Sequence, residues 1–295
     1  MDRPEVLVAV GDPEHVEQLV RTASDLARVV GGGVRIVSVV VKSHDSPFGV
    51  FSDETIADRY SGDRRAFLDR ASDVVPDDVP VEAEILVARS VDRGLLRAVA
   101  ETGPAALLIG WRARDRQRSG VVLGTSVDAV LRRATCDVYV ERIGQLANGV
   151  EAVLLPVAGG PHVRPAAVIA GAVAAANDAT VTVLSVAGPD EDHESAAERV
   201  AEGRAAIEAA PGPAVETRTV VREAADVEDA LVDAAAAHDV VAFGATRRGA
   251  FRARLVGSVP RRVAERTNQT VLLARAAEEA GGPLRSLVDR VRSWR

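Results

Sequence analysis

The chain repeats one pattern of segments, and this duplication limits what it can fold into. VGDPEHV, which starts at position 10, corresponds to VAGGPHV at position 157, and VRIVSVV at 34 corresponds to VTVLSVA at 181. Both pairs have an offset of 147 residues. Late in each copy, Gly124-Thr125 corresponds to Gly257-Ser258 with an offset of 133. By the difference between the two offsets, the first copy carries about 14 extra residues, which we place in the region 43–65.

Two copies predict two domains, at residues 1–145 and 150–277, with a separate tail at 281–295. In each copy, five apolar segments alternate with four helical ones, and only 3% of the residues are aromatic. Small branched side chains suit parallel strands that helices cover on both faces. We therefore expect an α/β fold with two tandem five-stranded parallel sheets, doubly wound and Rossmann-like. In the first copy we expect strands at 5–10, 34–41, 81–87, 105–109 and 137–141 and helices at 15–30, 54–75, 92–101 and 125–133.

The last strand of each copy is short and apolar. Asp137–Glu141 and Thr270–Ala274 would each leave unpaired backbone groups at a sheet edge. We therefore expect the two copies to pack together through these strands, as an intrachain pseudo-dimer.

The best candidate binding stretch follows the fourth strand of the second copy. An apolar run, Val240–Phe243, ends at Gly244, and Gly257-Ser258 opens the next helix. Ligands of such sheets bind beyond the carboxyl ends of strands, where the strand order reverses. A Gly-Ser pair at a helix start offers N–H groups and a hydroxyl to a phosphate. Basic loops precede both helices, and their arginines either neutralise phosphates or are simply solvated; they are Arg112, Arg114, Arg116, Arg118, Arg247, Arg248, Arg252 and Arg254.

These residues resemble the universal stress protein family, in tandem. The hallmark of that family is G-x2-G-x9-G-[S/T] after the fourth strand. In the second copy, Gly244 and Gly257-Ser258 occupy the outer positions. Arg247 replaces the middle glycine, and Gly249 lies two residues later.

The first copy departs further from the pattern. Gly110 and Gly124-Thr125 are one residue too far apart, and the middle glycine is again missing. Nucleotide-binding members also have an aspartate at the end of the first strand. Neither copy has it there, although Asp12 is adjacent in the first copy. The resemblance makes ATP a possible ligand, with these glycines, Ser258, Thr125, Arg247 and Asp12 as the candidate binding residues.

Two functions therefore remain open. One is a regulatory stress-response module without catalytic activity. The other is an ATP or nucleotide sensor that uses the glycine loop of the second copy. The resemblance implies a sheet like that of the adenine nucleotide alpha hydrolases. The loop and helix segments after the fourth strands look most like stress-protein domains appended to amino-acid permeases, so a membrane transporter is a possible partner.

Other functions receive little support from the residues. A net charge of −7 disfavours nucleic acid as a partner. No Ser-His-Asp, Cys-His or paired-carboxylate spacing stands out, so we expect no catalytic residues and no enzyme. His15 and His162 recur at equivalent first-turn positions, where a helix-start role is favoured over a metal site. Without a signal peptide or a long apolar run, a cytoplasmic location is expected.

The tail has the pattern of a basic amphipathic helix. Leu284, Leu287, Val288, Val291 and Trp294 form one apolar stripe, and four arginines accompany it. Short terminal helices usually dock on their own protein, which is what we expect here. An anionic membrane surface is the alternative.

Overall fold

The computed structural model describes residues 3–42, 52, 55, 62–111, 125–144, 149–245 and 258–277. The first copy contributes strands β1 (Glu5–Ala9), β2 (Gly33–Val41), β3 (Val81–Ala88), β4 (Ala106–Gly110) and β5 (Asp137–Arg142), and helices α1 (Val16–Val30), α3 (Gly62–Ser72), α4 (Val91–Thr102) and α5 (Thr125–Arg133). The second copy contributes strands β6 (Ala152–Pro156), β7 (Thr180–Ala187), β8 (Thr217–Glu223), β9 (Val240–Gly244) and β10 (Thr270–Arg275), and helices α6 (Val163–Asn177), α7 (His193–Glu208), α8 (Val227–Ala235) and α9 (Ser258–Arg266).

Apart from α3, the elements of the first copy match the segments expected from the sequence to within a few residues at their ends. The charged helix expected over 54–75 is described from Gly62 to Ser72. The tail at 281–295 lies outside the described residues, so the expectation for it stays a prediction.

All ten of these strands belong to one sheet, in the order β3-β2-β1-β4-β5-β10-β9-β6-β7-β8. Within each copy the strands are parallel, and the strand order reverses beside β1 and beside β6. This is the doubly wound arrangement that the alternation of segments predicts.

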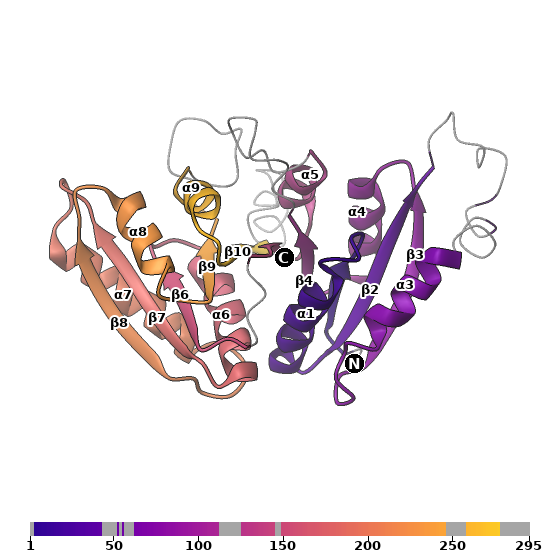
Figure 1. The fold of residues 1–295 in the computed structure, drawn as a ribbon, viewed down its shortest axis with the longest axis horizontal. Coiled ribbons are helices and arrows are strands. Elements are labelled where there is room, and N and C mark those ends of the chain that lie inside the picture. The colour runs from indigo at the N-terminus through magenta and orange to yellow at the C-terminus, as the bar shows by residue number, and fades with distance from the viewer. Residues whose placement is uncertain are drawn as a thin grey trace, which may run out of the picture.

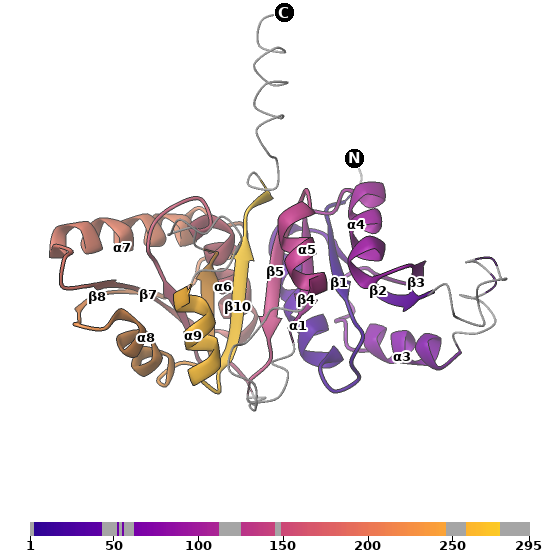
Figure 2. The same cartoon turned by 90° about the horizontal axis from the view of Figure 1, so that it is seen from above.

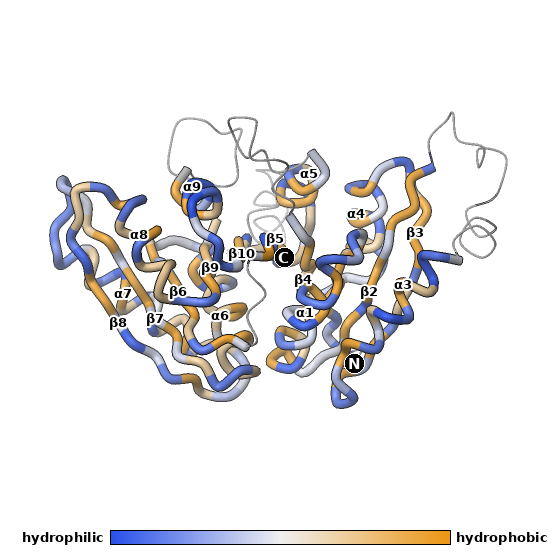
Figure 3. The backbone as a smooth tube through the Cα atoms, in the orientation of Figure 1, coloured by the Kyte–Doolittle hydropathy of each residue, from blue (hydrophilic) through white to orange (hydrophobic). Residues whose placement is uncertain are grey.

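Helices cover both faces of the sheet (Figure 1). The helices α1, α3, α6 and α7 lie on one face, and α4, α5, α8 and α9 lie on the other. Each face has an apolar core to which both copies contribute. The strands in the middle of the sheet are hydrophobic along most of their length, and hydrophilic residues gather at the turns and on the helices (Figure 3). α1 and α6 also contact each other, so the core on their face continues from one copy into the other.

The predicted pairing of the two last strands is confirmed. β5 and β10 lie side by side at the middle of the sheet and run antiparallel (Figure 2). Val140 lies opposite Leu273, and these two positions differ by the repeat offset of 133. A pseudo-two-fold axis therefore passes through this pair, and we call the β5–β10 contact the seam.

Two arginines make reciprocal hydrogen bonds across the seam. Arg142 donates to the carbonyl oxygens of Thr267 at 2.6 Å and Gln269 at 3.1 Å. The Arg275 guanidinium, which is 1% exposed, donates to the carbonyl oxygens of Ala134 at 3.1 Å and Cys136 at 2.8 Å. Each donor and each acceptor is 133 residues from its counterpart, so the two copies hold each other in the same way. Bonds from a charged donor are stronger than neutral ones, and they fix the register of the seam.

Seam side chains also differ in size between the copies. Tyr139 lies opposite Ala274, and Glu141 lies opposite Leu272. In the first pair a large side chain lies opposite a small one, and in the second a carboxylic acid lies opposite an apolar side chain. The seam is therefore symmetric in its backbone and in its two arginines, and asymmetric at Tyr139 and Glu141.

Helix starts follow the local sequence. The Asp192 side chain accepts the Ser195 amide at the start of α7, and the Asp226 side chain accepts two amides at the start of α8. His15 and His162 occupy the N-cap positions of α1 and α6, as expected, but neither side chain makes a capping hydrogen bond. Instead, Nδ1 of His162 accepts the amide of Ala276 at 3.1 Å, which ties the end of β10 to the start of α6.

Candidate functional site

Each copy has a cavity at the carboxyl ends of its strands, where the strand order reverses. The first-copy cavity has a volume of about 520 Å³ and the second-copy cavity about 290 Å³. Corresponding residues line both; the pairs are Val37 and Leu184, Val39 and Val186, Val91 and Val227, Leu95 and Leu231, and Gly110 and Gly244. Because the two copies are antiparallel across the seam, the cavities lie at opposite edges of the sheet.

An arginine held by a buried serine recurs in both cavities. Arg64 of α3 donates from Nη1 to Oγ of Ser38 in β2 at 2.8 Å. Arg199 of α7 donates from Nε to Oγ of Ser185 in β7 at 3.0 Å. The serines are 0% and 1% exposed, and both arginines line their cavities. A buried hydroxyl with one such bond holds a flexible guanidinium in one place and uses only one of its five N–H groups.

The two cavities differ in what surrounds that arginine. Nη2 of Arg199 also forms an ion pair with Oε2 of Glu191 at 2.9 Å, and Glu191 lines the same cavity. Arg64 has no ion pair among the described residues. The second-copy cavity also includes His162 and Phe243, whereas the first is lined mostly by aliphatic side chains.

Glycine is needed at two places beside the second-copy cavity. Gly159 and Gly160, in the loop after β6, have φ angles of +77° and +96°, which other residues rarely adopt. At Gly244 a β-carbon would lie 2.8 Å from the carbonyl oxygen of His162. At Gly110 it would meet only the flexible end of Leu19, at 3.0 Å. The backbone is therefore packed more closely at the end of β9 than at the end of β4.

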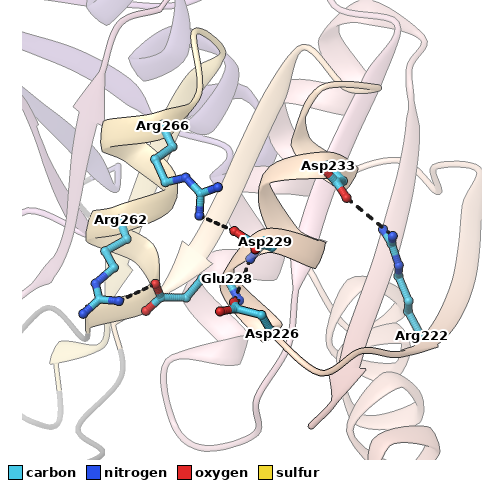
Figure 4. A network of polar contacts seen from close by, with 7 residues as sticks. All are labelled: Arg222, Asp226, Glu228, Asp229, Asp233, Arg262 and Arg266. Atoms are coloured by element: carbon cyan, nitrogen blue, oxygen red, sulfur yellow. Dashed lines mark hydrogen bonds and ion pairs between the residues drawn. The ribbon is translucent and has the colours of Figure 1, made fainter.

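Ion pairs join α9, whose first turn lines the second-copy cavity, to α8 (Figure 4). Arg262 and Arg266 of α9 bind Glu228 at 2.7 Å and Asp229 at 2.6 Å, both on α8. Asp226 in turn accepts the amides of both acidic residues. The position of α5 that corresponds to Arg262 is Ala129, which cannot form such a pair.

Apart from Asp12, the sequence-predicted site residues fall into three groups. Gly110 and Gly244 line the cavities. Thr125 and Ser258 begin α5 and α9, and their neighbours Ser126, Val259 and Pro260 contribute to the linings. Arg247, Gly249, Gly257 and Gly124 lie outside the described residues, as do the arginines of the basic loops.

Asp12 lies beside the helix start and does not line the first-copy cavity. Its Oδ1 accepts the amide of Glu14 at 3.1 Å, and its Oδ2 lies 3.4 Å from Nδ1 of His15. The three side chains offer oxygen and nitrogen atoms within 4.8 Å of one another. Exposed acidic groups often come this close without binding a metal ion, so we assign no metal site to them.

Sequence reasoning missed the serine–arginine pairs. Ser38 and Ser185 were readable as core hydroxyls, and Arg64 and Arg199 as ordinary residues of charged helices. The available signal was their recurrence: a serine at the same position of an apolar strand in both copies, 147 residues apart.

A buried acid lies at the seam, and its position also gave no sequence signal. Glu141 is 0% exposed, and neither carboxyl oxygen has a hydrogen-bond partner of normal geometry among the described residues. Burial raises its pKa to about 8, although the nearby Thr22 and Gln18 side chains oppose the rise. Burial also raises the pKa of Asp25 on α1 to about 7, against the opposing charges of Arg28 and Arg21. Asp25 lines a third cavity, of about 700 Å³, to which α1 and α6 both contribute.

None of the helices in the described ranges is long and apolar enough to cross a membrane.

Comparison with known proteins gives the family. No curated protein matches the chain. Among solved structures, a universal stress protein from Archaeoglobus fulgidus DSM 4304 aligns with a TM-score of 0.62 at 15% identity, covering 93% of this chain and 97% of the other. A protein of unknown function from Pseudomonas aeruginosa PAO1 aligns with a TM-score of 0.58 at 13% identity, covering 99% and 98%. At these identities the likeness shows the fold alone. The model of the universal stress protein family matches residues 3–142 and again 149–275. The chain therefore belongs to the universal stress protein family, with two family domains in tandem.

Proposed function

We propose that this chain is a regulatory module of a stress response that binds a small ligand and catalyses no reaction. The observation that carries the proposal is the repetition of one cavity, with one serine-anchored arginine, in both copies. Ligands of doubly wound sheets bind at the carboxyl ends of the strands, where the strand order reverses, and both cavities lie there. Mostly apolar walls with a few placed polar groups are typical of recognition sites.

The composition of the walls supports binding over catalysis. Among the described residues, the first-copy cavity has Ser126 and Arg64 as its polar side chains. The described lining of the second has His162, Glu191 and Arg199 as its polar side chains, and no hydroxyl or thiol. Neither set pairs a nucleophile with a base.

Mass spectrometry of small molecules released on denaturation tests this proposal. We expect one molecule to be released unchanged from gently purified protein, and no turnover when it is added back. Turnover that Arg64→Gln or Arg199→Gln abolishes would contradict the proposal.

A second candidate function is an ATP sensor in the second copy. The observation that favours it is the close packing at Gly244, together with the start of α9 in the cavity lining. If the second copy binds ATP, Gly257→Val should abolish binding, because a branched side chain blocks the approach to the helix N-terminus. Gly124→Val is the matched control and should matter less. Absence of measurable affinity at millimolar ATP with magnesium would remove this candidate.

The partner we propose is a protein, and the family resemblance makes a membrane transporter the first one to test. Contact of the tail with the membrane is a separate alternative. Co-sedimentation with anionic vesicles, for the full chain and for a truncation after Ala280, tests it. Equal binding by both forms, or none by either, would exclude a membrane role for the tail.

A further inference from the structure

We propose that the first-copy cavity binds an aliphatic carboxylate, with Arg64 holding the carboxylate and the aliphatic wall holding the hydrocarbon chain. The proposal rests on the regulatory function above and gives its ligand a chemical class.

The charge of Arg64 is the first argument. Its guanidinium donates to the buried Ser38 hydroxyl at 2.8 Å and forms no ion pair among the described residues. The side chain is half-buried, so its charge is only partly solvated. A planar guanidinium binds a carboxylate through two parallel hydrogen bonds. Because Ser38 uses one N–H group, enough donors remain for such a pair.

The wall of the cavity is the second argument. It is built largely from valine, leucine and isoleucine side chains of β2, β4, α4 and α5, and in the described residues it includes no aromatic ring. A nucleotide base would find no ring to stack on and few side-chain donors or acceptors for its edges. A hydrocarbon chain needs neither, and each buried methylene group adds to its affinity. The volume of about 520 Å³ is ample for such a chain.

The second-copy cavity supplies the contrast. There the equivalent arginine, Arg199, is already paired with Glu191 at 2.9 Å. A carboxylate ligand would have to displace Glu191 from Arg199, or bind beside it against the repulsion of the two negative charges. The volume of about 290 Å³ is also smaller. We therefore assign the carboxylate to the first copy.

Calorimetric titration of the full chain with octanoate, 1-octanol and AMP tests the proposal. We expect octanoate to bind at one site per chain and at least about tenfold more tightly than 1-octanol, because only the acid makes charge-assisted hydrogen bonds. AMP should bind more weakly than octanoate. No octanoate binding, equal affinity for octanoate and octanol, or a preference for AMP would each overturn the proposal. This comparison of three ligands uses the wild-type chain, so its result does not depend on whether a variant folds.

Two matched variants locate the site. Arg64→Gln should weaken octanoate binding at least about tenfold and leave octanol binding unchanged. Arg199→Gln should leave octanoate binding unchanged. Equal losses in both variants, or a loss in Arg199→Gln alone, would contradict the assignment to the first copy. If the chain does not bind octanoate but releases another bound molecule, the carboxylate proposal is wrong and the regulatory proposal stands. If the chain turns over a substrate, the regulatory proposal itself is wrong.

Discussion

The two copies share one scaffold and differ in how they use its charges. Both hold an arginine against a buried strand serine beside a cavity, yet only Arg199 has an acidic partner, Glu191, in the described structure. In the second copy, acidic and basic groups also fix α9 to α8. At its cavity the second copy pairs the arginine with an acid, whereas Arg64 of the first copy forms no ion pair with any described residue. The two copies therefore share a backbone arrangement and differ in the polar groups around their cavities.

The seam also combines a symmetric backbone with differences between the copies, here in how deeply its two equivalent arginines are buried. Removing the arginine of one copy or of the other shows whether the two arginines contribute equally to the free energy of unfolding. Arg275→Ala leaves two buried carbonyl groups without their donor, which should cost about 4 kcal/mol at about 1–3 kcal/mol for each group. Arg142→Ala should cost about half as much, since Arg142 is partly exposed and water can replace it. Urea unfolding of both variants measures the two losses of stability, and equal losses would contradict the expectation that the more buried arginine contributes more.

The buried acid Glu141 makes the seam sensitive to pH in one copy only, since its counterpart is Ala274. Its pKa rises from 4.5 to about 8 on folding, so the unfolded chain binds fewer protons between these values. Its stabilising contribution is therefore complete below about pH 4.5 and is lost as the pH rises to about 8. Glu141→Gln should flatten this slope and raise the free energy of unfolding at pH 8 by at least about 2 kcal/mol.

The measurement is urea unfolding of wild type and Glu141→Gln from pH 5 to pH 8. The variant should keep a smaller slope of the same sign, because Asp25 also has a raised pKa, about 7. A variant with the full wild-type slope would show that Glu141 does not bind the proton.

The ends of β4 and β9 should differ in their tolerance of a side chain. Gly244→Ala places a methyl group against the backbone of His162, which cannot move without shifting α6. We expect a loss of about 2 kcal/mol, within the range for overpacked sites. Gly110→Ala meets only the end of the Leu19 side chain and should cost less than about 1 kcal/mol. Thermal unfolding of the two variants measures the difference, and a larger loss at Gly110 would reverse our account of the packing.

The smallest effect is expected from the ion pairs of α9. Arg262 is 61% exposed, so Arg262→Ala should cost only about 0.5 kcal/mol of stability. Raising the salt concentration should reduce that difference further. A loss of several kcal/mol in urea unfolding would mean that the α8–α9 pairs are more important for stability than their exposure indicates.

The sequence predicted the scaffold well because the scaffold depends on patterns that recur along the chain. Apolar runs separated by helical spacing gave the strands, the offset gave the duplication, and two unpaired edge strands gave the seam. Gly110 and Gly244 were located for the same reason, since a glycine that ends a strand is a local signal.

The polar groups could not be predicted in this way, because their partners are distant in sequence. Arg64 and Ser38 are 26 residues apart, and nothing in the sequence indicates that the arginine of a charged helix meets the serine of an apolar strand. Arg275 and Cys136 are 139 residues apart and meet only because the seam brings them together. Glu141 looked like the polar end of a strand, and its side chain is buried beside Thr22 and Gln18 of α1, on the face that α1 and α6 cover together.

Amide hydrogen exchange along β5 and β10 of the full chain tests the central claim, that two family domains form one continuous sheet. In a strand that pairs on both sides, successive amides bond to alternate neighbours. If the seam is closed, all amides of residues 138–142 and 271–275 that lie within the ladders should be protected as strongly as those of β1 and β6. If every second amide of β5 and β10 exchanges as fast as the outer amides of the edge strands β3 and β8, the seam is open and the claim is wrong.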